Sequence, residues 1–81
     1  SSAAGAAIEK AKAAAAARAS MSPEEKLAQE IDALKKRVEK AEARLEKARS
    51  EDDPNTAAFE TALEKMREKL SAKQEQAGGQ S

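Results

Sequence analysis

The sequence of 81 residues contains no histidine, cysteine, tryptophan or tyrosine. Without cysteine there is no disulfide and no thiolate nucleophile, and the redox compartment cannot be inferred. Without histidine there is no imidazole for acid–base catalysis, and the usual zinc ligand sets are excluded as well. We therefore expect no catalytic residue, no metal site and no cofactor, and we expect that the protein is not an enzyme.

Large apolar side chains are scarce too. The composition is 40% hydrophobic, but it holds a single phenylalanine and much of the apolar content is alanine. Alanine favours helix yet buries little surface. Burying one large apolar side chain contributes roughly 1.5–3 kcal/mol, whereas ordering each residue costs about 1.5 kcal/mol. Such a core is marginal, and we expect the chain to gain a partner or to be a segment of a larger protein.

Long apolar runs and an excess of either charge are also missing. No run approaches the ~20 residues of a membrane span. Fifteen basic and fifteen acidic residues balance, which gives no overall attraction to nucleic acid or acidic lipid. No glycine-rich phosphate loop occurs. We expect no membrane partner and no small-molecule substrate, and the localisation stays open between cytoplasmic and exported for a soluble chain.

What the sequence does contain is a heptad pattern of apolar residues with alternating steps of four and three. The positions in this row are Leu27, Ile31, Leu34, Val38, Ala41, Leu45 and Ala48. This spacing is typical of a helix that lies along another helix. Ser22, Pro23 and Glu25 form a capping-box pattern, and together with the heptads they predict a helix over 23–50.

A second heptad segment follows a polar break. Residues 51–54 predict a turn, with Asp53 as N-cap and Pro54 at the first position of a helix over 54–76. This helix carries apolar residues at the same spacing, namely Phe59, Leu63, Met66 and Leu70. The acidic turn does not fit a calcium loop, because alanines stand where such a loop needs a ligand and a glycine. Gly78 or Gly79 is expected to end the helix in a left-handed conformation.

The two segments predict an all-α fold, an antiparallel helical hairpin with coiled-coil-like packing. In the register that pairs small with large side chains, Ala48 faces Phe59 and Val38 faces Leu70. The predicted seam residues are Val38, Ala41, Leu45, Ala48, Phe59, Leu63, Met66 and Leu70. A parallel two-stranded coiled coil is the main alternative, but it leaves the second heptad segment without a role.

The same register leaves Leu27, Ile31 and Leu34 without apolar residues opposite them, and these three are the candidate partner-facing residues. An uncovered apolar row attracts a partner. Residues 1–20, an arm rich in alanine and serine, could fold back over the row as a third helix. A second chain could cover it instead and give a dimeric four-helix bundle.

The expected organisation is therefore an arm over 1–20, helical or partly disordered, a hairpin over 21–77 and a disordered tail over 78–81. The expected function is a non-catalytic protein–protein interaction or oligomerisation module whose partner is protein, either a second copy or another helical chain. One alternative is a helical segment of a secreted or translocated bacterial effector or toxin. Weak nucleic-acid binding through Lys35, Lys36 and Arg37 is the second alternative, although nucleic acid is the less expected partner because acidic residues flank this run.

Overall fold

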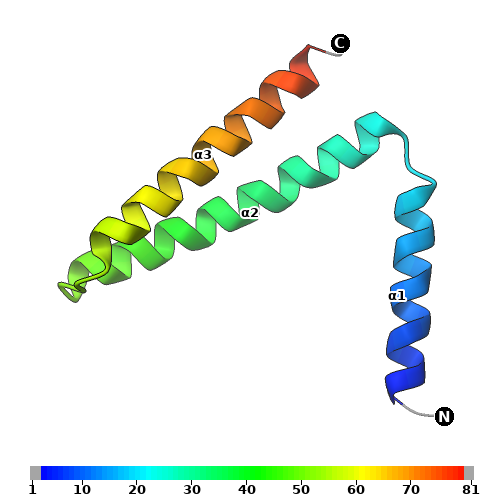
Figure 1. The fold of residues 1–81 in the computed structure, drawn as a ribbon, viewed down its shortest axis with the longest axis horizontal. Coiled ribbons are helices and arrows are strands. Elements are labelled where there is room, and N and C mark those ends of the chain that lie inside the picture. The colour runs from blue at the N-terminus through cyan, green and yellow to red at the C-terminus, as the bar shows by residue number, and fades with distance from the viewer. Residues whose placement is uncertain (1–2, 80–81) are drawn as a thin grey trace.

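The structure, a computed structural model that describes residues 3–79, consists of three helices (Figure 1). They are α1 (Ala3–Ala19), α2 (Pro23–Ser50) and α3 (Thr56–Gly78). No strand occurs within the described residues, and the prediction of an all-α chain is confirmed. Residues 1–2 of the predicted arm and 80–81 of the predicted tail lie outside the described residues.

The start of α2 is fixed by a side-chain cap. Ser22 is extended, with φ −68° and ψ 160°, and its hydroxyl oxygen accepts a hydrogen bond from the backbone N–H of Glu25 at 3.1 Å. Pro23, which has no N–H to leave unpaired, occupies the first turn. The helix then runs without interruption to Ser50. Its residues have high helix propensity, and the cap stabilises its first turn.

The end of α2 is a Schellman motif built without glycine. The N–H of Asp53 donates to the carbonyl of Ala48 at 2.9 Å, and the N–H of Asp52 donates to the carbonyl of Arg49 at 3.3 Å. Asp52 has φ 51°, the one positive φ among the described non-glycine residues. Aspartate tolerates the left-handed region better than most residues, so this acidic residue serves where glycine is usual.

α3 begins at Thr56, two residues later than predicted. Asp53 does cap a backbone N–H, since its Oδ1 accepts from Asn55 at 2.7 Å. Its carbonyl, however, accepts a hydrogen bond from the N–H of Thr56 at 3.1 Å, which closes a β-turn of four residues, 53–56. Pro54 and Asn55 therefore belong to the turn, and the α-helical pattern starts after them.

The C-terminal end of α3 also differs from the prediction. Gly79, which follows the last helical residue, keeps right-handed angles of φ −70° and ψ −10°. Its N–H donates to the carbonyl of Glu75 at 2.9 Å, as in a continuing helix. The expected left-handed glycine is wrong, because neither Gly78 nor Gly79 has a positive φ.

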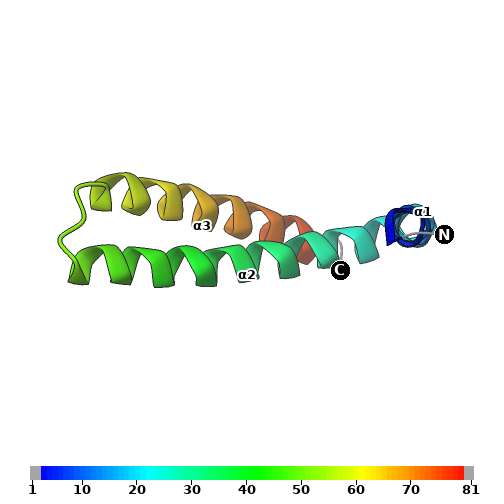
Figure 2. The same ribbon diagram turned by 90° about the horizontal axis from the view of Figure 1, so that it is seen from below.

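α3 packs against α2 and runs back alongside it (Figures 1 and 2). Three ion pairs join the two helices: Arg49–Glu60 at 3.2 Å, Arg67–Glu42 at 3.0 Å and Lys73–Glu30 at 2.5 Å. The separation of the partners along the chain grows from 11 to 25 to 43 residues. Exposed pairs contribute about 0–1 kcal/mol each, so the buried apolar contacts carry most of the packing energy.

α1 lies apart from this pair of helices. Figure 2 looks along the axis of α1 and across the axes of α2 and α3. No residue of α1 is buried, and the expectation that the arm folds back over the apolar row of α2 is wrong. The radius of gyration is 17.4 Å, against about 12 Å for a compact chain of this length. Ile8 is the one exposed large apolar side chain among the described residues, at 55% exposure, and it is not buried against α2.

The packing of α3 depends on one side chain in particular. Leu63 is 3% exposed and is the one buried residue of α3. We expect Leu63→Ala to lower the free energy of unfolding of the α2–α3 pair by about 2–5 kcal/mol, because it leaves a cavity. Urea denaturation followed by circular dichroism measures this loss. Ile8→Ala, which changes a side chain that is 55% exposed, serves as the control and should leave the transition unchanged.

The left-handed residue of the turn gives a second prediction. Asp52→Gly removes the Cβ contact that a left-handed backbone imposes, and we expect it to stabilise the fold by about 1 kcal/mol. Glu51 has an ordinary φ of −99°, so Glu51→Gly removes no unfavourable Cβ contact. It should lower the stability instead, because glycine raises the conformational entropy of the unfolded chain. The two midpoints of thermal unfolding test this contrast. Shifts of the same sign in both variants would contradict the Schellman assignment.

Candidate functional site

The predicted seam residues lie between α2 and α3. Val38, Leu45 and Leu63 form a buried cluster, and four partly buried residues pack against it, namely Ala41, Phe59, Met66 and Leu70. The eighth seam residue, Ala48, is 3% exposed. Arg44 places its guanidinium carbon 5.4 Å from the centre of the Phe59 ring, a favourable cation–π distance. These side chains are buried in the contact between α2 and α3, so they are not accessible to a ligand.

The candidate partner-facing row is largely covered within the chain. Leu27 and Leu34 are each 6% exposed, and Ile31 is half-buried. The expectation of an uncovered row is therefore wrong for the two leucines. Lys73 occupies the position opposite Leu34, and both residues line the same pocket. A lysine stem covers apolar surface while its ammonium group reaches a polar partner. The partner-facing role of the row stays a prediction, and this burial weakens it.

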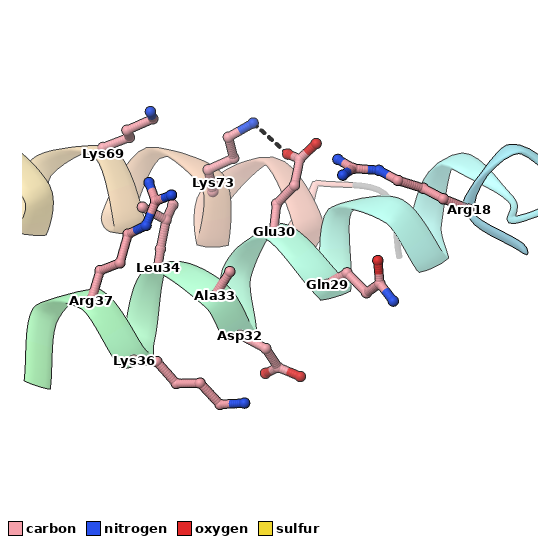
Figure 3. Close-up of a pocket in the computed structure, with 10 residues that line it drawn as sticks. All are labelled: Arg18, Gln29, Glu30, Asp32, Ala33, Leu34, Lys36, Arg37, Lys69 and Lys73. Carbon is pink, nitrogen blue, oxygen red and sulfur yellow. Dashed lines mark hydrogen bonds and ion pairs between the residues drawn. The ribbon is translucent and has the colours of Figure 1, made fainter. Parts of the chain in front are cut away.

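A pocket of about 750 Å³ lies where the end of α1 approaches α2 and the C-terminal half of α3 (Figure 3). We call it the cationic pocket. Its basic lining residues come from all three helices and are Arg18, Lys36, Arg37, Lys69 and Lys73. Two acidic residues, Glu30 and Asp32, also line it. Five positive and two negative groups leave a formal charge of +3 in a chain whose net charge is zero.

Glu30 and Lys73 form the tightest ion pair of the described residues, with Nζ 2.5 Å from Oε2. Their side chains are 37% and 31% exposed, whereas those of the other three pairs are about half exposed or more. The hydrogen bond from Lys73 and its positive charge hold the pKa of the Glu30 carboxyl below its usual value, against a smaller opposing effect of desolvation. Arg18 and Lys69 lower this pKa further through their charges.

The remaining cations of the pocket are not neutralised. Arg18, Lys36, Arg37 and Lys69 make no ion pair within 4 Å among residues 3–79. In Figure 3, Arg18 points from α1 toward Glu30, and Lys69 and Arg37 lie together on the other side of Lys73. Asp32 and Lys36 point away from this group. With Lys36 set aside, the pocket holds three cations without an ion pair near the Glu30–Lys73 pair.

The basic run predicted from the sequence overlaps only partly with the pocket. Lys36 and Arg37 line it, and Lys35 does not. Arg18, Lys69 and Lys73 were missed, because single basic residues on helix surfaces carry no pattern. One signal was present: Lys73 stands at a heptad position, where the apolar stripe of α3 fades.

The lining of the pocket contains more cationic than anionic groups. Within residues 3–79, no three acidic, histidine or cysteine side chains lie close enough to hold a metal ion. None of the described helices has the length and apolar character that crossing a bilayer requires. The groups that the pocket does offer are hydrogen-bond donors with fixed positive charge.

No protein-family model matches the chain, and comparisons with curated proteins and with solved structures found no significant match.

The Glu30–Lys73 pair predicts a pH dependence of stability. The pKa of Glu30 is lower in the folded chain, so the pair contributes stability that is complete above the pKa of an unfolded glutamate, about 4.3. This contribution is lost as the pH falls through the lowered pKa of the folded state. We expect the wild type to lose more stability than Glu30→Gln between about pH 6 and about pH 3, measured by urea denaturation.

Glu64→Gln is the matched control for this experiment. Glu64 is an exposed carboxylate on α3 that has no ion pair among the described residues. Its neutralisation should leave the pH dependence close to that of the wild type. Identical pH profiles for the wild type and Glu30→Gln would show that the pair adds nothing to folding.

Proposed function

We propose that the chain is a non-catalytic protein–protein interaction and oligomerisation module. In this proposal α2 and α3 form an antiparallel helical hairpin with coiled-coil-like packing, and the hairpin is the folded scaffold. The alanine-rich helix α1 is the element that contacts the partner. The partner that we favour is a second copy of the chain, which gives an assembly of two hairpins held through their α1 helices.

The observation that carries the proposal is the complete exposure of α1. Every residue from Ala3 to Ala19 is exposed. Ile8, at 55% exposure, is the one exposed large apolar side chain in the described part of the chain. Most of the stability of a helix in a protein comes from tertiary packing, and α1 buries no residue within the described chain. A partner helix would supply the missing packing.

One side of α1 suits such a contact. At 100° per residue, Ile8, Ala11 and Ala15 lie within a narrow strip. Lys12 and Arg18 border this strip on either side by the same geometry. Small side chains let two helix axes approach closely, so a second α1 could pack there with Ile8 as the main apolar contact.

No feature of the structure specifically favours either of the two alternative functions. A secreted or translocated bacterial effector segment is compatible with an exposed α1, but nothing in the geometry favours export. For nucleic acid, the run from Lys35 to Arg37 is short, and Asp32 and Glu39 flank it on the same helix. A phosphate backbone needs a continuous basic surface.

The proposal predicts that α1 becomes ordered as the chain self-associates. Between about 10 μM and about 1 mM, we expect the mass from sedimentation equilibrium and the protection of the amides of residues 3–19 from hydrogen exchange to rise together. We expect Ile8→Gln to abolish both changes, because it removes the main apolar contact.

Ala17→Gln is the matched control, since residue 17 lies on the opposite side of α1 from Ile8 at 100° per residue. It introduces the same side chain and should leave the association unchanged. A chain that stays monomeric and folded over this range, with unprotected amides in α1 throughout, would disprove self-association through α1.

A further inference from the structure

We propose that the cationic pocket binds a carboxylate-rich segment of a partner protein. This inference rests on the proposed function as an interaction module, because it names the chemistry of a protein that the module contacts. It concerns a different surface from the strip on α1. The pocket lies between α2 and α3, Arg18 near the end of α1 also lines it, and each helix thus contributes at least one cation.

The first argument is electrostatic. Glu30 is already paired with Lys73, while Arg18, Arg37 and Lys69 are without an ion pair in the described structure. Like charges gathered around one concave surface repel each other and attract an anion from solution. An anionic ligand would therefore relieve a repulsion that the free chain retains.

The second argument concerns which anion fits. The pocket already holds one carboxylate, since Glu30 accepts a hydrogen bond from Lys73 and also lies within the electrostatic influence of Arg18 and Lys69. Arginine binds carboxylates through two parallel hydrogen bonds, and Arg18 and Arg37 can both offer this geometry. Carboxylates of a ligand would repeat an interaction that the chain itself makes.

The third argument concerns the size and the lining of the ligand site. The volume of about 750 Å³ exceeds the needs of a single small anion, and the exposed apolar residue Ala33 also lines the pocket. A peptide segment can place methylene groups against this apolar part and several carboxylates on the surrounding cations. A nucleic acid is a poorer match, because no aromatic residue lines the pocket to stack a base.

Binding would also hold α1 in place. Arg18 belongs to α1, which buries no residue, and Arg37 and Lys69 belong to the two packed helices. A ligand that contacts all three side chains connects α1 to the α2–α3 pair through charge rather than through apolar packing.

The test measures binding of a fluorescein-labelled hexaglutamate peptide to the full 81-residue chain by fluorescence anisotropy at about 20 mM salt, where charges are weakly screened. The pocket variant is Arg37→Gln with Lys69→Gln, which neutralises two exposed side chains that have no ion pair. We expect its affinity for the peptide to fall about tenfold. Thermal unfolding checks that the variant is folded.

The matched control is Lys35→Gln with Lys65→Gln. It removes the same total charge from α2 and α3 at exposed positions outside the pocket lining, and the affinity should change less than about twofold. Equal losses in the two double variants would overturn the proposal, because binding would then depend on net charge alone. Absence of hexaglutamate binding, or binding of a hexaglutamine peptide with equal affinity, would also overturn it.

Two further outcomes would assign the pocket to another ligand and contradict the proposal. One is tighter binding of inorganic phosphate or of a short DNA duplex than of hexaglutamate. The other is self-association that is lost when Glu51 and Asp52 are neutralised, which would place the acidic turn of a second copy in the pocket. Ile8→Gln should leave peptide binding unchanged, so the pocket and the association through α1 can fail independently.

Discussion

The burial of Leu63 against Val38 and Leu45 is the contact on which the rest of the structure depends. It is the one place where α3 buries a side chain completely enough to hold the helix in position. Lys69 and Lys73 reach the cationic pocket only because α3 lies along α2. The apolar cluster is small, so the position of α3, and with it the shape of the pocket, depends on a modest packing energy.

The turn between α2 and α3 decides the direction in which this packing occurs. Asp52 enters the left-handed region, and the amides of Asp52 and Asp53 close back onto the last turn of α2. The chain reverses within a few residues, and the heptad rows of the two helices come to face each other. The ion pairs between α2 and α3 adjust the register of this contact but are too exposed to create it.

The chain consists of a packed pair of helices and a third helix that buries no residue. α2 and α3 use their apolar rows on each other, while α1 leaves its surface to solvent. The cationic pocket lies at the junction of these parts, where basic side chains from all three helices line one surface. A chain of zero net charge can thus carry a local surface that is strongly positive.

Local features were predictable from the sequence alone. The all-α composition and the start of α2 can be derived from alanine content, heptad spacing and the Ser22 cap, because a helix and its cap are made by residues within one turn of each other. The predicted start of α3 is two residues too early. The N–H of Thr56 donates to the carbonyl of Asp53, and this backbone hydrogen bond cannot be predicted from the residue types. Only the tertiary structure showed that Leu34 is covered, that α1 stands free and that Arg18, Arg37 and Lys69 share one pocket. These residues are far apart in the chain, and their proximity depends on helix directions that the turn and the buried cluster set together.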